Sequence, residues 1–308
     1  AGEAGSSNAL ARLPSESRPL AERFAEPPPS ARILRILHKQ QDQPEAQDKV
    51  LRQLEAQGFG GFAGNVSFDG YVDDETKWPA FLRAVALAKE AGMSVWLYDE
   101  CGYPSGSARD LTLRGHPEWA ARGLLVAETN VCSGGAVSLA LPPGRLVSAV
   151  ALPRRDGKVA LAEAKDLAGA VADGRLSWQA PGGEWFVAAM TDDLLYEGTH
   201  AAVSLAFKKP CIDLLTPEPT ARFIAETHER YAAKLGKNLG TYFVSTFTDE
   251  PSLQNYWMRP MPYRVLPWSL TLEREFRSRR GYALAPVLPA LVADAGPAGA
   301  QVRYDFWL

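Results

Sequence analysis

Two apolar runs that each end in an Asp-Glu pair constrain this chain more than any other feature. Ser94–Glu100 reads SVWLYDE, and Tyr242–Glu250 reads YFVSTFTDE. A strand buried in a parallel sheet is a nearly continuous run of apolar residues. In α/β folds the ligand site lies just beyond the carboxyl ends of such strands. The runs therefore predict parallel strands whose ends carry paired carboxylates. The alternative is that Asp99 and Asp249 cap helices and that each glutamate lies in a first helical turn.

The composition is that of a globular protein and excludes several function classes. Of 308 residues, 46% are hydrophobic and 22% are charged, so the chain is long enough to bury a core. The net charge is −3 with both signs mixed along the chain, which argues against a nucleic-acid partner. No segment approaches the roughly 20 apolar residues of a membrane span. We expect neither a nucleic-acid nor a membrane partner.

Residues that bind metals or form disulfides are few and scattered. Cys101, Cys132 and Cys211 show no CxxC spacing, and the four histidines form no HExxH motif. No acidic segment has the spacing of an EF-hand loop. The sequence predicts no metal site and no cofactor.

Residues 31–123 alternate strand and helix patterns, after a leader or surface arm over residues 1–30 that is rich in Ala, Ser, Glu and Pro. Three strands and two helices are predicted: Ile33–Leu37, Gln43–Gln57, Phe59–Phe68, Asp73–Ala91 and Ser94–Tyr98. Short connections of this kind are typical of a parallel β/α sheet. The turn after Leu37 lacks the glycines of a nucleotide-binding fold, which favours a barrel.

Residues 124–208 have a different pattern, with short alternating runs separated by Gly and Pro turns. Such spacing predicts a small antiparallel β-sandwich inserted into the barrel. Residues 209–308 return to barrel character, with elements predicted at Glu218–Leu235, Tyr242–Phe247 and Trp268–Arg280. A further β/α unit is expected to begin at Val302–Leu308. Since a TIM barrel needs eight strands and only four are predicted, we expect an α/β fold with a partial, incomplete TIM-type barrel.

Several segments resemble the α-L-rhamnosidase-like glycoside hydrolases. The string Val95–Ala108 (VWLYDECGYPSGSA) and the later Phe247–Ser252 (FTDEPS) carry the resemblance. Three more segments fit the same family: Gly58–Phe62 (GFGGF), Glu226–Tyr231 (ETHERY) and Phe276–Tyr282 (FRSRRGY). The match runs from about Ile33 to the end of the sequence, with a β-rich insertion at the expected place.

The resemblance implies a bacterial glycosidase that is secreted or periplasmic and acts on a polysaccharide or glycoside, with an α-L-rhamnoside as a candidate substrate. It implies a carbohydrate as the partner, and Ca²⁺ enters by the resemblance alone. In related barrels one catalytic carboxylate follows the fourth strand and another follows a later strand. This chain does not reach the later strand, so the remaining half of a longer polypeptide is an expected partner.

Glu250 is the expected general acid, at the end of the fourth predicted strand. Two-carboxylate hydrolysis needs one group to protonate the leaving oxygen and another to act at the anomeric carbon or its water. Asp249 and nearby aromatic residues are placed to favour a protonated Glu250. The alternative is that Glu250 caps a helix after Pro251. Because neighbouring strands lie about 4.8 Å apart, Glu100 can complete a catalytic pair.

Six residues are predicted to bind substrate: Asp99, Tyr98, Tyr103, His38, Asn65 and Trp257. The resemblance implies that Asp99 and Glu100 hold sugar hydroxyls or orient other groups. Tyr98 and Tyr103 would form a pocket wall, and Trp257 would stack on a sugar ring. The simpler interpretations are core packing for Tyr98 and local turn formation for the polar residues that follow the first two strands.

Two other classes of function remain open. The chain fits a carbohydrate-binding protein without catalysis, or an inactive fragment of a larger glycosidase. A substitution that removes the Glu250 carboxyl distinguishes them, because a binding protein has no turnover to lose.

Overall fold

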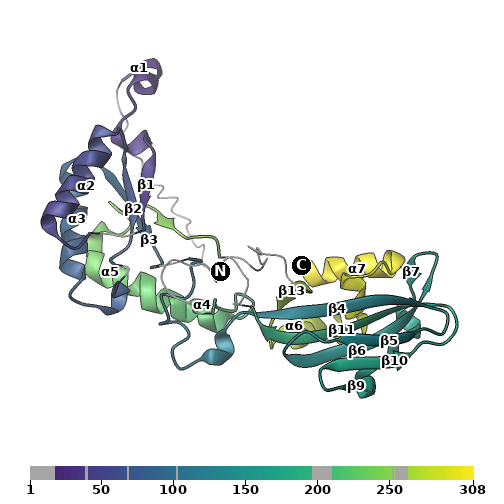
Figure 1. The fold of residues 1–308 in the computed structure, drawn as a ribbon. Coiled ribbons are helices and arrows are strands. Elements are labelled where there is room, and N and C mark those ends of the chain that lie inside the picture. The colour runs from purple at the N-terminus through teal and green to yellow at the C-terminus, as the bar shows by residue number, and fades with distance from the viewer. Residues whose placement is uncertain are drawn as a thin grey trace, which may run out of the picture. The chain divides into compact units, whose positions relative to one another are not determined.

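The computed structural model describes residues 18–38, 41–67, 69–101, 103–195, 210–251, 253 and 263–308. The chain forms two compact units, each assembled from two stretches of sequence. Unit 1 contains Ala1–Leu111 and Phe223–Glu250, and unit 2 contains Thr112–Arg222 and Pro251–Leu308. Both belong to a mixed α/β fold with several sheets (Figure 1).

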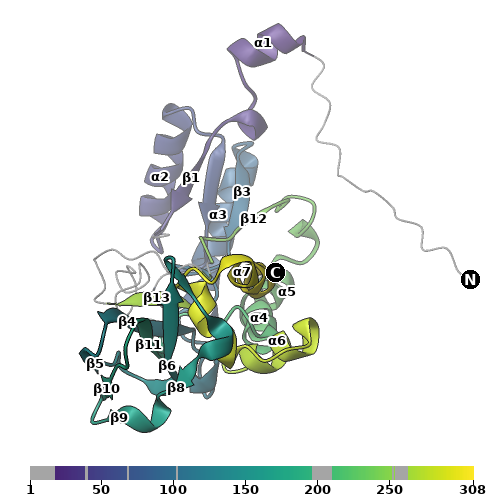
Figure 2. The same cartoon turned by 90° about the vertical axis from the view of Figure 1, so that its right-hand side faces the viewer.

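Unit 1 is built on a parallel sheet whose strands are arranged in chain order. The strands are β1 (Leu34–Leu37), β2 (Gly61–Gly64), β3 (Ser94–Tyr98) and β12 (Thr246–Phe247), in the order β1-β2-β3-β12. All three neighbouring pairs are parallel, and β12 lies beside β3 in Figure 2. A doubly wound sheet reverses its strand order at a switch point, whereas a barrel adds strands sequentially. The sheet is therefore consistent with a partial barrel.

Two helices connect the first three strands and lie along the sheet (Figure 1). They are α2 (Pro44–Ala56) and α3 (Trp78–Glu90), and α3 contacts β3. Gly58, with φ of 77°, follows the end of α2 and allows the backbone to turn into β2. The other helical elements of this unit include the helices α1 (Leu20–Ala25) and α5 (Arg230–Leu235), the π-helical turn η7 (Ala225–Glu229), and the 3₁₀ turns η1 (Pro29–Ala31), η2 (Tyr71–Asp73) and η8 (Gly236–Asn238).

The glycines at the start of β2 permit an unusually close approach between strands. Gly61 has φ of 149°, and a Cβ there would lie 1.8 Å from the carbonyl oxygen of Ser94 on β3. At Gly60 a Cβ would lie 2.0 Å from the carbonyl oxygen of Pro29. Any side chain at Gly61 would force β2 and β3 apart, so the segment GFGGF keeps this sheet together.

Unit 2 contains two antiparallel sheets. The larger has the order β13-β4-β11-β6-β7, with β8 also paired to β6, and the smaller has the order β5-β10-β9. The strands are β4 (Arg122–Cys132), β5 (Ala136–Ala140), β6 (Arg145–Arg155), β7 (Lys158–Val159), β8 (Lys165–Asp166), β9 (Val171–Ala172), β10 (Arg175–Gln179), β11 (Glu184–Leu194) and β13 (Arg264–Trp268). The helical elements are η3 (Pro117–Trp119), η4 (Leu161–Glu163), η5 (Ala168–Ala170), α6 (Leu272–Arg280), η9 (Ala285–Leu291) and α7 (Gly296–Trp307). The helix α4 (Pro217–Ile224) begins in unit 2.

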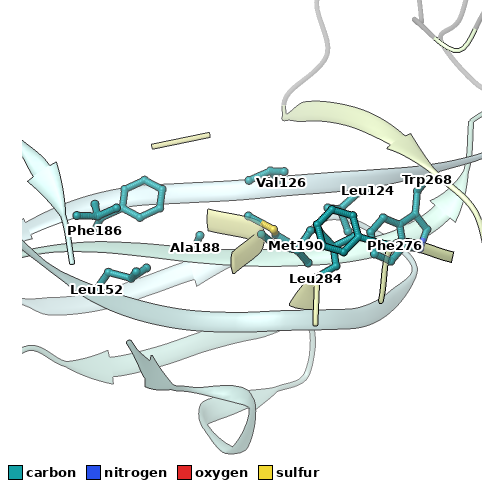
Figure 3. Packing of buried hydrophobic residues seen from close by; sticks show 11 residues of the cluster. Leu124, Val126, Leu152, Phe186, Ala188, Met190, Trp268, Phe276 and Leu284 are labelled. Atoms are coloured by element: carbon teal, nitrogen blue, oxygen red, sulfur yellow. The ribbon is translucent and has the colours of Figure 1, made fainter. Parts of the chain in front are cut away.

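The central strand β11 is covered on both faces. Phe186, Ala188 and Met190 belong to a cluster that includes Phe276 of α6 and Leu288 of η9 (Figure 3). The alternate residues Trp185, Val187 and Ala189 belong to a second cluster with Val137 and Leu176 of the smaller sheet. Because successive side chains point to opposite faces of a strand, the apolar side chains on both faces of β11 are buried. The antiparallel sheets predicted within residues 124–208 are present.

A buried ion pair stabilises one end of the larger sheet. The Asp192 side chain on β11 is fully buried. Its Oδ1 accepts a 2.6 Å hydrogen bond from Nε of Arg122, and its Oδ2 accepts a 3.1 Å bond from Nη2 of Arg145. A buried carboxylate needs such partners because desolvation of an isolated charge is costly.

The C-terminal stretch differs from the sequence prediction. Trp268 was expected to begin a helix, but it ends β13, which pairs with β4, and α6 begins at Leu272. Val302–Leu308 was expected to begin a new β/α unit, whereas residues 296–307 form α7. Trp268 and Phe276 belong to the apolar cluster of the larger antiparallel sheet, and Phe306 of α7 packs against the same cluster. Residues 251–308 accordingly belong to unit 2, and the described part of this stretch adds no strand to the parallel sheet.

The fourth parallel strand is also shorter than predicted. The apolar run Tyr242–Phe247 suggested six strand residues, but β12 contains only Thr246 and Phe247. Tyr242 instead donates a hydrogen bond from its hydroxyl to the carbonyl oxygen of Met93 at 2.6 Å. In the described part of the chain, no helix has the length and apolar character needed to cross a bilayer.

Candidate active site

The carboxyl ends of all four parallel strands carry polar residues. His38 follows β1, Asn65 follows β2, Asp99 and Glu100 follow β3, and Thr248, Asp249 and Glu250 follow β12. Because the strands are parallel and adjacent, these residues lie at the same edge of the sheet. The structure thus brings the two Asp-Glu pairs together.

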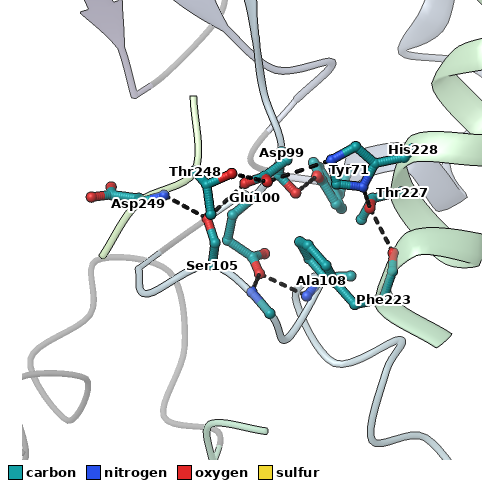
Figure 4. Close-up of polar contacts among 11 residues, drawn as sticks. Tyr71, Asp99, Glu100, Ser105, Ala108, Phe223, Thr227, His228, Thr248 and Asp249 are labelled. Carbon is teal, nitrogen blue, oxygen red and sulfur yellow. Dashed lines mark hydrogen bonds and ion pairs between the residues drawn. The ribbon is translucent and has the colours of Figure 1, made fainter. Parts of the chain in front are cut away.

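Asp99 is the centre of a hydrogen-bond network at this edge (Figure 4). Its side chain is buried. The Ser105 hydroxyl donates to its Oδ1 at 2.7 Å, and the Thr248 hydroxyl donates to its Oδ2 at 2.7 Å. Burial raises the pKa of Asp99, while these two hydroxyl donors oppose the rise. The Asp99 carboxyl group therefore links the loop that follows β3 with the segment that follows β12.

Hydrogen bonds fix both the backbone and the side chain of Asp249. Its backbone N–H donates to Oγ of Ser105 at 2.8 Å, and its carbonyl oxygen accepts from the Ser105 N–H at 2.9 Å. The Tyr98 hydroxyl donates to its Oδ2 at 2.6 Å. Burial, together with this bond to the carboxylate, raises the pKa of Tyr98, so the phenol remains a neutral donor. Asp249 is half-buried and keeps a fixed orientation.

Glu250 is the exposed carboxylate of the site. The Tyr103 hydroxyl donates to its Oε2 at 2.5 Å, across 147 positions of sequence. Its backbone has a φ of 41°, which an L-residue with a side chain rarely adopts. Strain of this kind persists only where neighbouring contacts enforce it, and it concentrates at functional sites. Here the contacts are those of Asp249 and Tyr103.

Glu100 is enclosed by its own loop. Its Oε1 accepts from the N–H groups of Cys101 at 2.9 Å and Arg109 at 2.8 Å. Its Oε2 accepts from the N–H groups of Ala108 at 2.7 Å and Gly106 at 3.2 Å. Burial raises the pKa of Glu100 to about 7, against the effect of these four donors. With 1% of its surface exposed, Glu100 orders the loop that follows β3, and its catalytic role stays a prediction.

Three of the residues predicted to bind substrate have hydrogen-bond partners within the chain. Asp99, Tyr98 and Asn65 are buried. Asn65 donates from Nδ2 to the carbonyl oxygen of Glu100 at 2.5 Å, and its Oδ1 has no hydrogen-bond partner among the described residues. Their roles in substrate binding stay predictions. Tyr103 is half-buried, and His38 is exposed with its ring 6.0 Å from that of Tyr98. Trp257 lies outside the described residues.

Sequence reasoning assigned no role to two residues beside this network, Thr227 and His228. His228 lies on the π-helical turn η7 (Ala225–Glu229), within the segment ETHERY. A π turn inside an α-helix is rare and frequently accompanies a functional site. The motif resemblance marked this segment, but nothing in the linear sequence indicated which strand end it would face.

The acidic residues of the site do not form a calcium cage. Within the described ranges, no group of three or more His, Cys, Asp or Glu side chains is arranged to hold a metal ion. The carboxylates of Asp99, Asp249 and Glu250 accept hydrogen bonds from hydroxyl groups, and that of Glu100 accepts from backbone amides. Calcium requires six to eight oxygen ligands, so these residues do not fit the ion.

The fold has a distant counterpart among solved structures. No protein-family model matches this chain, and no curated protein matches its sequence. The rhamnosidase from Novosphingobium sp. PP1Y is similar in structure, with 14% sequence identity and a TM-score of 0.48. The similarity is distant. It covers 94% of this chain and 44% of that protein, so the chain spans less than half the length of the solved structure.

Proposed function

We propose that this chain carries part of the active site of a glycoside hydrolase, with Glu250 as the general acid. The observation that carries the proposal is the convergence of two carboxylate pairs at one edge of a parallel sheet, joined through Ser105 and Thr248 to Asp99. Glycoside hydrolysis uses a pair of Asp or Glu side chains around the scissile bond. Sites at the carboxyl ends of parallel strands are the usual location in β/α folds.

The geometry supports separate roles for the carboxylates. Glu250 is exposed and can reach the oxygen of a glycosidic bond. It would give its proton to that oxygen as the bond to the anomeric carbon breaks. Water would add its hydroxyl group to that carbon and give its other proton to the second carboxylate. The hydroxyl of Tyr103 then stabilises the glutamate that remains. Among the residues that the structure describes, Asp249 is the candidate for the second carboxylate, and Tyr98 orients its side chain.

We propose a carbohydrate as the ligand, with an α-L-rhamnoside as the first candidate. Support for the sugar comes from the resemblance of VWLYDECGYPSGSA and FTDEPS to rhamnosidase-like enzymes. We also propose that the complete enzyme is a longer, secreted or periplasmic polypeptide, because four parallel strands do not close a barrel. Its added strands would place the later catalytic carboxylate that the resemblance implies.

A carbohydrate-binding role without catalysis is the second candidate. The burial of Glu100 favours it, since this leaves fewer carboxylates at the surface than the sequence suggested. Both candidates place a sugar against Glu250 and Tyr103, and they differ only in turnover.

The test compares Glu250→Gln with the wild type in the full-length polypeptide that contains this sequence. A hydrolase loses about 10²- to 10⁴-fold in kcat while its affinity for the glycoside persists. The control is Glu55→Gln, which changes an exposed glutamate of α2. Unchanged turnover in Glu250→Gln removes Glu250 from the mechanism. Saccharide binding without turnover in the wild type supports the second candidate.

A further inference from the structure

Unit 2 contains a cavity of about 250 Å³. Most of its wall comes from β13, α6 and α7, which are labelled in Figure 1. A cavity of about 150 Å³ is enough to hold benzene, so a substituted six-membered ring fits in this one. Leucine, proline, phenylalanine and tryptophan side chains make up most of the lining, and two arginines, two carboxylates and a threonine complete it. A mostly apolar wall with a few polar groups is typical of a site for a small ligand.

Trp307 supplies an exposed aromatic ring to this cavity. It lies near the end of α7 and is 50% exposed. The neighbouring Phe306 packs against the apolar cluster of the larger sheet, and the rings of Phe306 and Trp307 meet edge to face with their centroids 5.3 Å apart. This contact restricts the orientation of the indole. The electron-rich face of such a ring attracts polarised C–H groups, so it is suited to the apolar face of a sugar ring.

Arg280 and Asp305 bring polar atoms to the cavity that have no hydrogen-bond partner among the described residues. Nε of Arg280 donates to the carbonyl oxygen of Asp305 at 3.1 Å, and Oδ2 of Asp305 accepts from Tyr282 at 2.8 Å and from Gln301 at 3.1 Å. In the described part of the chain, neither Nη of Arg280 nor Oδ1 of Asp305 makes a hydrogen bond. The two side chains are only 23% and 11% exposed. Donors and an acceptor are thus available to a ligand at partly desolvated positions.

The charged side chains that line the cavity balance one another. Arg279 and Arg280 are cations, and Glu275 and Asp305 are anions. Nε of Arg279 lies 3.8 Å from Oε2 of Glu275, and Nε of Arg280 lies 3.7 Å from Oδ1 of Asp305. A charged ligand of either sign would meet a like charge in a partly desolvated place, which is costly. A hydroxyl group both donates and accepts, so it can bond to a carboxylate and to a guanidinium. The lining therefore favours a neutral ligand that carries hydroxyl groups.

We propose that this cavity binds one pyranose unit of a neutral saccharide. The apolar face of the sugar ring lies on Trp307. Its hydroxyl groups accept hydrogen bonds from Arg279 and Arg280 and donate to Asp305. This assigns a saccharide site to unit 2, in addition to the carboxylates at the parallel sheet of unit 1. Binding in the cavity involves no bond cleavage and does not rest on the proposed function.

The test measures binding at Trp307 itself, so that a sugar bound beside Glu250 does not count. The full-length polypeptide that contains this sequence is labelled with fluorotryptophan, and the fluorine resonance of Trp307 is identified by its absence in Trp307→Phe. The neutral probes are the methyl glycosides of glucose, mannose and rhamnose. Glucuronate and glucosamine are the charged counterparts of glucose, and phenylacetate is an apolar anion without hydroxyl groups.

We expect a saturable shift of the Trp307 resonance with at least one neutral glycoside at millimolar concentration, and none with the three charged probes. Arg280→Lys keeps the charge but loses the planar fork of donors, so the Kd should rise about 10- to 100-fold. Arg279→Gln changes a side chain that is 70% exposed, which leaves the fold intact, and should raise the Kd about 2- to 10-fold. Arg274→Gln is the matched control, because Arg274 also pairs with Glu275 from α6 but does not line the cavity.

Three results would overturn the proposal. The first is a Trp307 resonance that no neutral glycoside shifts. The second is a response to a charged probe that equals or exceeds the response to the neutral ones, since the cavity would then select an ion. The third is the same Kd in the wild type, Arg279→Gln and Arg280→Lys. Turnover is measured separately: if Trp307 responds but no glycoside is hydrolysed, the proposed function fails and this site stands. Hydrolysis without a response at Trp307 has the opposite meaning.

Discussion

The Thr248 hydroxyl donates a 2.7 Å hydrogen bond to Oδ2 of Asp99, across 149 positions of sequence. It connects the residues that follow β3 with those that follow β12. Only two residues of β12 pair with β3. A strand this short provides few backbone bonds to fix its register. The side-chain network around Asp99 therefore determines where Asp249 and Glu250 lie.

Ser105→Ala should weaken this connection. The serine hydroxyl donates to Asp99 and accepts from the N–H of Asp249, and alanine removes both bonds. We expect a loss of about 1–3 kcal/mol in the free energy of unfolding, measured by urea titration, since buried groups are left unpaired. Ser177→Ala, on an exposed position of β10, should change it by less than about 0.5 kcal/mol. Equal effects in the two variants would contradict the bridging role.

Glu100→Gln should destabilise unit 1 and change how its stability depends on pH. The glutamine NH₂ would face backbone N–H groups that now donate to a carboxylate oxygen, at a cost of about 1–3 kcal/mol. Burial raises the pKa of Glu100 to about 7, so the folded chain holds this proton more tightly than the unfolded chain. Its contribution is present at low pH and is lost as the pH rises toward 7.

The measurement for Glu100 is urea unfolding of both proteins at several pH values. The stability difference between wild type and Glu100→Gln should narrow from about pH 4.5 to pH 7. A difference that widens over this range would show that the four amide donors outweigh burial and keep the carboxylate ionised throughout.

Gly61→Ala tests the close approach of β2 and β3. The new Cβ would lie 1.8 Å from the Ser94 carbonyl oxygen, and the φ of 149° is unfavourable for alanine. We expect destabilisation by more than about 4 kcal/mol, or no folded unit 1 by circular dichroism. Gly58→Ala is the control, because a Cβ there meets no atom within 4 Å and only the φ of 77° is unfavourable. It should cost about 1 kcal/mol.

Asp192→Asn tests the buried ion pair of unit 2. Removing the charge leaves Arg122, whose side chain is 19% exposed, without its anion. We expect a loss of about 3–5 kcal/mol in the free energy of unfolding. Asp193→Asn, one position further along β11 and less buried, should be much milder. Unfolding of both variants at the same urea concentration would contradict a stabilising role for this ion pair.

The sequence predicted those parts of unit 1 that depend on local patterns. Ser94–Tyr98 was expected as a strand and is β3, and the helix expected over Gln43–Gln57 is α2, Pro44–Ala56. Continuous apolar runs, and glycines that end helices, are local signals. The parallel pairing of neighbouring strands follows from the order of these elements. The convergence of the two Asp-Glu pairs was predictable for the same reason.

Other features depend on contacts between distant residues, which no local pattern specifies. The pattern at Trp268 is compatible with a strand or a helix, and pairing of β13 with β4 decides between them. Asp99 and Glu100 are adjacent and chemically alike, yet Glu100 is enclosed by the amides of residues 101–109. His228 lies beside Asp99 only because η7 faces the end of β3.

The measurement that tests the central claim most directly is the dependence of the Glu250→Gln rate on the leaving group. In the full-length enzyme, kcat is compared for alkyl glycosides and for aryl glycosides whose phenols are acidic. If Glu250 is the general acid, the alkyl substrates should lose about 10²- to 10⁴-fold, and the aryl substrates much less, because an acidic phenol leaves without protonation. Equal losses for both kinds of substrate, or no loss for either, would contradict the account.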